Sequence, residues 1–521
     1  MKRKMRLAAL LCAAAVITAS GTASYAYDDE SAEDDISIVE IPSENGYDDI
    51  IYVDENGSEV FFDLVPDAEM YICTLPYYNL YDEGRMTSVK NQGKDGLCWA
   101  FAGMAAVESN LITQRLESIN IDLSEKYMAW FTSGTGPLDT NDPLYGDVKN
   151  ELGIQAYNKG GNLYDVTYLM ARGSGPVYES LVPQSTDSPL PETMRYISLY
   201  GLESMQMFDK NDISSIKTAV FENGGAFLSF YSSNSYLNTS NYAYYCPNST
   251  SPNHAVTIVG WDDSFSSTNF KTGANLSQPP ADGAWIIKNS WGADWGNSGL
   301  FYISYYDKSM KTVGSIKMAA DKEYDRIYQY DGNVKTFTRY PSNYISGGNI
   351  FTAASDETIN GVGFWTSDAD VPYRIRIYKN IPEGGTPTDG ELIYEQSGYE
   401  PYAGYHNVKF DQLPNIESDC RFSAVVDLLR TGTGITLDSY GYAQGTSFYS
   451  SYKNGTYSWK DSVASRSQNV CVKVLASEKE HIMTIGECID YVNSFDPNDT
   501  ILSDKQFEAV ERVLEYDYGK Q

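Results

Sequence analysis

The sequence predicts an α+β domain, followed by an all-β sandwich and a short helical tail. A chain of 521 residues is too long for a single hydrophobic core and should form two or three domains. In the first domain, an Ala-rich helical pattern begins at Cys98, whereas apolar runs typical of strands begin at His254 and Trp285. Between about residues 325 and 475, short stretches of alternating hydrophobicity are separated by turn residues, which is typical of a β-sandwich.

The charge of the chain argues against one class of partner. The chain has 38 Lys and Arg residues against 70 Asp and Glu, which gives a formal net charge of −32. Because such a chain repels polyanions, we expect no nucleic-acid partner, and the acidity suits a soluble extracellular protein. The 43 Tyr residues concentrate in strand-like segments, where an amphipathic β surface is a simpler interpretation than sugar stacking.

Residues 1–26 have the three parts of a secretory signal peptide. Residues 2–4 are Lys-Arg-Lys, residues 7–19 form an apolar run too short for a stable membrane span, and residues 24–26 supply small side chains for cleavage. We therefore expect a secreted, extracellular chain, either free or associated with the cell surface. Because no other long apolar stretch follows, we expect no membrane span in the mature chain.

Residues 27–74 precede the first predicted domain. An acidic run over residues 27–35 predicts disorder. Residues 50–62 alternate in hydrophobicity on both sides of Asn56-Gly57, which predicts a β-hairpin.

The Cys residues do not form the pattern of a disulfide-rich framework. If Cys98 is a free thiol, an odd number remains after removal of the signal peptide. Cys420 and Cys471 lie in the same predicted domain and could pair. The six Cys residues of the mature chain are Cys73, Cys98, Cys246, Cys420, Cys471 and Cys488.

Cys98 lies where a polar, Gly-rich loop becomes a helix. The first N–H groups of a helix have no partner inside the helix, and its dipole favours a negative charge there. A thiol at this place ionises more easily and can act as a nucleophile. The alternative is a buried structural Cys, which is the common fate of a free Cys.

His254 and Asn289 follow Cys98 in the chain. His254 begins an apolar β run, and Asn289 ends a second one within the segment Asn-Ser-Trp-Gly. They lie 156 and 191 residues after Cys98. A His at the end of a strand has a rigid position, which suits a catalytic base better than a solvated side chain.

Gln92-Gly93 and the segment Gly96 to Phe101 resemble the active-site segment of papain-like cysteine peptidases. The resemblance implies a two-lobed fold over residues 75–318. Where this family often has a second Cys, the chain has Asp95, so a disulfide is absent but no reacting group is lost. Residues 27–74 stand where the family has its propeptide. They are either a short propeptide or a hairpin that packs on the enzyme, and we favour packing.

The resemblance implies a role for each residue of the site. Cys98 attacks the scissile carbonyl, and Gln92 with the Cys98 backbone N–H stabilises the oxyanion. His254 forms a thiolate–imidazolium pair with Cys98 and protonates the leaving amine. Asn289 fixes the imidazole, and Trp291 shields their hydrogen bond from water.

The resemblance also implies a substrate site. Gly160 and Gly161 bind the substrate backbone as an extended strand, because a backbone approaches closely only where no Cβ intrudes. The other interpretation of this pair is a plain helix-entry turn. Ala226 and Gly161 line a pocket for the P2 side chain, which we expect to be medium-sized or large and apolar. We expect no metal and no cofactor.

Strands are predicted at residues 359–365, 373–378, 406–410, 422–428 and 470–474. The segment 347–378 resembles the lectin-like domain that follows the peptidase in some bacterial surface-associated proteins. This implies a sandwich over 325–475. Its role is left open between a carbohydrate or cell-surface ligand and packing, and calcium has no support in the sequence. Helical patterns at 485–492 and 504–516 predict a tail over 477–521.

The sequence thus predicts a secreted cysteine endopeptidase that cleaves protein or peptide substrates through an acyl-enzyme thioester. One alternative is a surface carbohydrate-binding or adhesin-type protein whose peptidase domain is catalytically silent. The presence of Gln92, Cys98, His254 and Asn289 argues against it. Another alternative, a transglutaminase-like or amidase-type Cys–His enzyme, lacks the Gln before the Cys.

Overall fold

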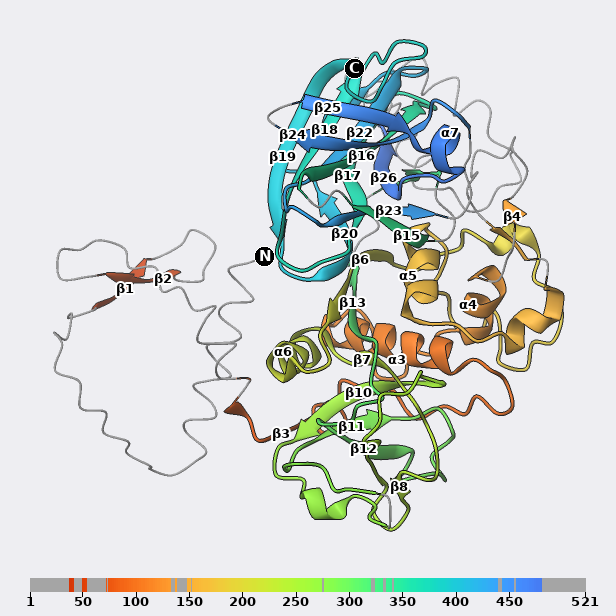
Figure 1. Cartoon of the computed structure of the whole chain (residues 1–521), viewed down its shortest axis with the longest axis vertical. Coiled ribbons are helices and arrows are strands. Elements are labelled where there is room, and N and C mark those ends of the chain that lie inside the picture. Colours follow the sequence, from red (N-terminus) through yellow and green to blue (C-terminus); the bar gives the residue numbers. More distant parts are fainter. Residues whose placement is uncertain are drawn as a thin grey trace, which may run out of the picture. The chain divides into compact units, whose positions relative to one another are not determined.

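A computed structural model of the chain is shown in Figure 1. The predicted signal peptide and most of the predicted helical tail lie outside the residues that the structure describes. Among the described residues, no helix is both long and apolar enough to cross a membrane. The described residues are 37–41, 49–53, 72, 74–132, 136–137, 148–150, 152–273, 276–319, 324–330, 334–339, 342–438, 443–453 and 456–479.

The chain divides into two units, Met1–Glu69 and Met70–Gln521. In the first unit, β1 (Ser37–Ile41) pairs antiparallel with β2 (Asp49–Val53). β2 contains the first arm of the hairpin predicted around Asn56-Gly57, and the second arm lies outside the described residues.

The predicted helix that begins at Cys98 is α3 (Cys98–Thr113), which is buried along nearly its whole length. A helix that is apolar on all sides lies inside a domain. Figure 1 shows α3 beside β7 (Ala226–Phe230) and β10 (His254–Asp262). α3 also packs closely on the helix that contains Val166. The absence of a side chain at Gly103 permits this, since a Cβ there would lie 2.7 Å from Val166.

Two further helices begin with a side-chain cap. α4 (Glu125–Thr132) follows Ser124, and the Ser124 Oγ accepts a hydrogen bond from the Tyr127 N–H at 3.1 Å, as an N-cap does. α5 (Leu163–Ala171) begins with a capping box made by Asn162 and Asp165. The described residues before 320 also form α6 (Ile213–Asn223) and three short 3₁₀ helices, η1 (Gly153–Asn158), η2 (Glu192–Met194) and η3 (Ser267–Asn269).

A long sheet lies beside these helices, with the strand order β14-β26-β17-β20-β6-β13-β7-β10-β11-β12-β9-β8. The register places His254 opposite Phe230 and Ile258 opposite Ala226. In the first part of the chain the strands are β3 (Tyr77–Asn79), β4 (Gly136–Pro137), β5 (Val148–Lys149), β6 (Gly201–Phe208), β8 (Leu237–Asn238), β9 (Ala243–Tyr244), β11 (Ala284–Lys288), β12 (Leu300–Ser304) and β13 (Val313–Ala319).

The described residues between 324 and 479 are all-β, as predicted, apart from the short helix α7 (Ser462–Arg466). A six-stranded sheet, β19-β18-β22-β16-β24-β25, packs on β14, β26, β17 and β20 of the long sheet through one apolar core. The strands are β14 (Arg326–Tyr328), β15 (Val334–Arg339), β16 (Tyr344–Thr352), β17 (Glu357–Thr366), β18 (Val371–Lys379), β19 (Glu391–Glu400), β20 (Ala403–Lys409), β21 (Asn415–Ile416), β22 (Arg421–Leu428), β23 (Gly434–Asp438), β24 (Ser447–Lys453), β25 (Thr456–Asp461) and β26 (Val472–Glu478).

Two details of this part bear on the sequence predictions. The five predicted strands lie on β17, β18, β20, β22 and β26. Cys420, however, is a free thiol, so the suggested disulfide with Cys471 is not formed. The Cys420 Sγ instead lies 3.7 Å from the Asn380 Oδ1, and Cys471 is buried in a different apolar cluster.

Candidate active site

Cys98 is the first residue of α3, and its side chain is half-buried. No side chain caps this helix end, so the first-turn N–H groups are not taken up by a capping residue. Burial raises the pKa of the Cys98 thiol, although hydrogen bonds from the backbone N–H groups of Ala255, Trp99 and Cys98 itself oppose this shift. The contact with Ala255 places the sulfur next to the residue that follows His254.

His254 is held by Asn289. The His254 Nε2 lies 2.9 Å from the Asn289 Oδ1, and both residues are buried. The ring of Trp291 stacks on the imidazole at a centroid distance of 4.8 Å and an interplanar angle of 22°. Because Nε2 is engaged by Asn289, Nδ1 is the ring nitrogen left for a reacting partner. The structure thus brings His254 together with Asn289 and Trp291, which follow it by 35 and 37 residues in the sequence.

Burial shifts the pKa of both side chains. It lowers the pKa of His254 to about 4, although the hydrogen bond to Asn289 raises it. The pKa of Cys98 is shifted upward by burial. Burial of the single side chain is the largest cause of each shift, and the thiolate–imidazolium pair stays a prediction.

Gln92 lies in the loop before α3, and its side-chain amide is fixed at both ends. The Gln92 Oε1 accepts a hydrogen bond from the Ser290 hydroxyl at 2.6 Å, and the Nε2 donates to the Asp95 carbonyl at 2.8 Å. The Gln92 backbone N–H also donates to the Ser290 carbonyl at 2.8 Å. An amide nitrogen carries two hydrogens, so one N–H of Gln92 can still donate to another acceptor.

Ser290 is a site residue that the sequence analysis did not single out. Its backbone N–H donates to the Asn289 Oδ1 at 2.9 Å, while its hydroxyl donates to Gln92. Ser290 therefore connects the residue that holds His254 with the loop that precedes Cys98. Its position within the Asn-Ser-Trp-Gly segment was the available signal.

Gly160 and Gly161 are exposed and lie next to the start of α3. A Cβ at Gly161 would lie 2.6 Å from the ring of Trp99, so only Gly fits there, whereas a Cβ at Gly160 would meet nothing within 4 Å. The Trp99 Nε1 donates to the Lys159 carbonyl at 3.1 Å and fixes the segment. The pair also leads directly into α5, so the helix-entry interpretation describes part of its role.

Ala226 is not at this site, which corrects the prediction that it lines a substrate pocket. It is fully buried, and it pairs with Ile258, four residues along β10 from His254. At the rise of a strand this is about 13 Å from the catalytic end. The residues of β7 at that end are Phe230, opposite His254, and Ser229, opposite Ala255.

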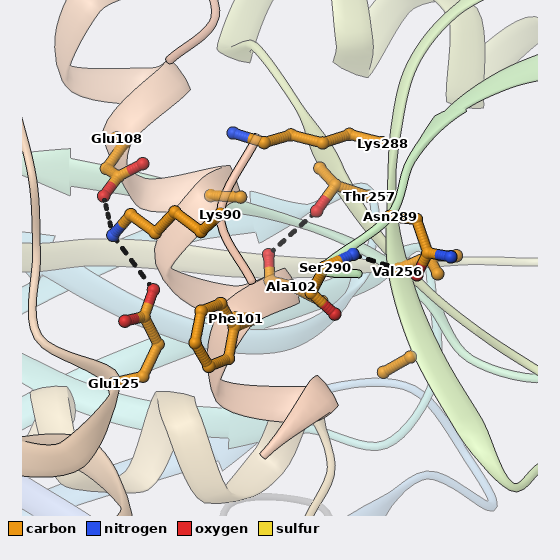
Figure 2. A pocket seen from close by; sticks show the side chains of 12 residues that line it. Lys90, Phe101, Ala102, Glu108, Glu125, Val256, Thr257, Lys288, Asn289 and Ser290 are labelled. Atoms are coloured by element: carbon orange, nitrogen blue, oxygen red, sulfur yellow. Dashed lines mark hydrogen bonds and ion pairs between the residues drawn. The ribbon is translucent and has the colours of Figure 1, made fainter. Parts of the chain in front are cut away.

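A buried cluster of charged residues lies behind the site (Figure 2). The Lys90 Nζ lies 2.8 Å from Glu108, 3.0 Å from Glu125 and 2.6 Å from Asp122. Burial alone would lower the pKa of Lys90, but the carboxylates of Glu108 and Glu125 outweigh it and raise that pKa. Burial raises the pKa of Glu125 to about 8, against the effect of Lys90, and the nearby carboxylate of Glu108 also raises it.

The opposite side of the cluster is formed by Lys288. Its Nζ donates to the Thr87 carbonyl at 3.0 Å and to the Thr87 hydroxyl at 2.9 Å, and burial lowers its pKa to about 8. Thr87 in turn donates to Glu108 at 2.6 Å. Figure 2 shows Lys288 and Lys90 reaching toward α3 from two different segments. Lys90 precedes Gln92 by two residues, and Lys288 directly precedes Asn289. The cluster therefore anchors the segments of Gln92 and Asn289 to Glu108 on α3.

The sequence analysis did not predict this cluster. A signal was present, because Glu108 is a carboxylate inside an otherwise apolar helical pattern. Among the described residues, no group of three or more His, Cys, Asp or Glu side chains could hold a metal ion.

Comparison with known protein families matches two parts of the chain. Residues 78–130 and 168–321 match the model described as "Papain family cysteine protease", and residues 327–476 match the "Lectin like domain" model. Two curated relatives are 28% identical: the senescence-specific cysteine protease SAG12 of Arabidopsis thaliana, over 251 residues, and cathepsin J of Mus musculus, over 255 residues. Each match covers 46% of this chain. The chain spans 59% and 64% of the lengths of these relatives.

Solved structures resemble both parts together. The clostridial cysteine protease Cwp84 after propeptide cleavage aligns with a TM-score of 0.65 at 24% identity, over 77% of this chain and 99% of that chain. A structure of the cysteine protease and lectin-like domains of Cwp84, a surface layer associated protein of Clostridium difficile, aligns with a TM-score of 0.63 at 23% identity, over 78% of this chain and 89% of that chain. At these identities the likeness describes the fold.

Proposed function

Because the chain combines a papain-family cysteine protease domain with a C-terminal lectin-like domain, we propose that it is a cysteine endopeptidase that uses Cys98, His254 and Asn289. One observation carries the proposal. The Asn289 Oδ1 lies 2.9 Å from the His254 Nε2, and the backbone of Ala255, the residue after His254, acts to lower the pKa of the Cys98 thiol. Both observations support a nucleophile near a base that a third group orients.

The pKa shifts support attack by a thiol whose proton is removed as it reacts. His254 Nδ1 accepts the Cys98 proton while the sulfur bonds to the scissile carbonyl carbon. The tetrahedral intermediate then breaks its C–N bond, and the leaving amine takes the proton from His254. Cys98 now carries the acyl group as a thioester. Water then attacks the thioester carbonyl carbon, and His254 accepts a proton from this water. When the C–S bond breaks, His254 donates the proton to the sulfur, and the carboxylic acid leaves.

The negative oxygen of the intermediate has two candidate donors. One is the backbone N–H of Cys98, at the uncapped start of α3. The other is the free N–H of the Gln92 side chain, whose orientation is fixed by Ser290 and Asp95. Donors that are already oriented stabilise the transition state without reorganisation, and loss of one costs about 3–4 kcal/mol in comparable enzymes.

The exposed segment of Gly160 and Gly161 supports an extended peptide as substrate. It lies against Trp99, the residue after the nucleophile, and its backbone can pair with the backbone of a peptide. Residues 1–26 support export of the chain, which places protein substrates outside the cell. A carbohydrate or cell-surface ligand for the sandwich remains a prediction.

The test compares the wild-type chain with Cys98→Ala in hydrolysis of an unstructured protein substrate. We expect cleavage by the wild type, loss of cleavage in Cys98→Ala, and an acyl adduct on Cys98 in the intact mass of the wild type after rapid acid quenching. Cys420→Ala is the matched control, because it removes a free thiol of the sandwich. Equal rates in wild type and Cys98→Ala would refute the proposal.

A further inference from the structure

The segment of Gly160 and Gly161 is continuous with α5. Asn162 caps this helix, with its side chain accepting from the Tyr164 N–H at 2.8 Å and its backbone N–H donating to Asp165 at 2.9 Å. These two hydrogen bonds fix the backbone conformation where the chain enters α5. The position of α5 therefore determines where Gly161 lies relative to Trp99 and the adjacent Cys98.

The outer side of α5 packs against the sandwich. The ring of Trp365, on β17, lies 4.9 Å from the ring of Tyr168 and 5.9 Å from the ring of Tyr164. Trp365 is 1% exposed, and it belongs to the same apolar cluster as α3 and α5. The core that contains the first helices is thus completed by a side chain from the second part of the chain.

The backbone fixes the same contact. β20 of the sandwich pairs antiparallel with β6, with Tyr405 opposite Met205. The Asn407 Nδ2 donates to the Leu202 carbonyl at 2.6 Å. A Cβ at Gly404 would clash with the Met205 carbonyl, so the strands meet at the closest approach a backbone permits. One sheet continues from the sandwich into the first part of the chain, which excludes a freely tethered domain.

We propose that the lectin-like domain positions the substrate-binding segment, with Trp365 as the positioning residue that holds α5 and, through it, Gly160 and Gly161. This inference rests on the proposed function for its kinetic consequence. The ring contacts of Trp365 are with Tyr164, Tyr168 and Tyr405. Its removal is expected to weaken the binding of substrates that occupy the non-primed subsites and to leave the nucleophile intact.

The test uses Trp365→Ala in the full chain. We expect KM to rise about tenfold for a peptide with apolar P2 and P3 residues, because small displacements of a binding segment are costly. The rate at which iodoacetamide alkylates Cys98 should equal that of the wild type. Amide hydrogen exchange over residues 158–171 should become faster, and this readout does not depend on activity.

Trp459→Ala is the matched control. Trp459 lies on β25, where it stacks on Tyr457 at 4.9 Å and packs near Phe448, and its Nε1 donates to Thr388. We expect this variant to match the wild type in KM and in exchange over residues 158–171. Trp365→Phe retains an aromatic ring and should keep KM and exchange over residues 158–171 near the wild-type values, since the Trp365 Nε1 has no hydrogen-bond partner among the described residues.

Two results would overturn the inference. One is equal exchange over residues 158–171 in Trp365→Ala and Trp459→Ala. The other is a fall in alkylation of Cys98 by the same factor as peptide hydrolysis, which would indicate general damage. If Trp365→Ala does not fold, Trp365→Leu carries the same comparison. A wild type without peptidase activity would refute the proposed function, whereas the exchange measurement would still decide the positioning role.

Discussion

The Ser290 hydroxyl donates a 2.6 Å hydrogen bond to the Gln92 Oε1, although the two residues are 198 positions apart in the sequence. This bond joins the segment that contains Asn289 to the loop that leads into Cys98. Both residues are buried, so the bond is shielded from competition with water. It fixes the direction in which the free N–H of Gln92 can donate.

We predict that Ser290→Ala lowers kcat about fivefold with little change in KM, because a lost hydrogen bond costs about 1 kcal/mol and acts here on the oxyanion donor. The measurement is steady-state hydrolysis of a peptide. In the double variant Gln92→Ala/Ser290→Ala, the serine substitution should add almost nothing to the loss caused by Gln92→Ala. Additive losses would show that Ser290 acts independently of Gln92.

A second prediction concerns Asn289→Ala. The hydrogen bond to Asn289 raises the pKa of His254, so its removal should lower that pKa further and move the acid limb of the pH profile to lower pH. The same change frees the imidazole to rotate, and we expect kcat to fall about 10- to 100-fold, the value of one strong hydrogen bond. An acid limb that moves to higher pH would contradict this assignment.

The reactivity of Cys98 gives a third prediction. Because burial raises its pKa, Cys98 should be mostly a thiol at neutral pH, and its alkylation by iodoacetamide should accelerate as the pH rises through the alkaline range. Alkylation as a function of pH, followed by peptide mass, measures this. A fast rate that stays constant from pH 7 down to about pH 4 would instead support the thiolate–imidazolium pair.

Burial of His254 predicts a pH dependence of stability. Its pKa in the folded chain, about 4, lies below the ordinary value of 6.5, so the unfolded chain binds a proton first as the pH falls. The free energy of unfolding should therefore decrease between about pH 6.5 and pH 4 and show no further loss from this group below pH 4. Urea unfolding of the wild type and of His254→Gln at several pH values is the measurement. The free energy of unfolding should change less with pH in the variant. His406→Gln is a control for removal of an imidazole in the sandwich.

The candidate site could be predicted where its chemistry is local in sequence. Cys98 at a helix start, His254 at a strand start and Asn289 before Ser-Trp-Gly are each visible in their own segment, and the structure brings His254 and Asn289 together. Ala226 could not be placed in this way, because its distance from the site depends on the register between β7 and β10.

Long-range partners were the part that the sequence did not reveal. The pairing of β6 with β20 joins segments about 200 residues apart, and no periodicity within either strand specifies a partner. The charged cluster is similar, since Lys90, Glu108 and Lys288 come from three segments. The pKa shifts of Cys98 and His254 also depend on burial, which follows from packing and cannot be read from either motif.

The charged cluster gives the last prediction. Glu108 is fully buried and accepts hydrogen bonds from the Lys90 ammonium, the Thr87 hydroxyl and the Leu123 backbone N–H. Glu108→Ala leaves these donors without that acceptor and should lower the free energy of unfolding by about 3–5 kcal/mol. Guanidinium unfolding of the full chain, at a pH where the wild type is two-state, is the measurement.

Glu117→Ala is the control for Glu108→Ala. Glu117 also accepts two hydrogen bonds, from the hydroxyls of Tyr178 and Tyr200, but it lies nearer the surface, where such bonds contribute about 1 kcal/mol or less. If the two variants lose equal stability, the buried cluster is not the anchor of the site. If Glu108→Ala is the less stable variant and also loses kcat, the cluster couples stability to catalysis through the two lysines that precede Gln92 and Asn289.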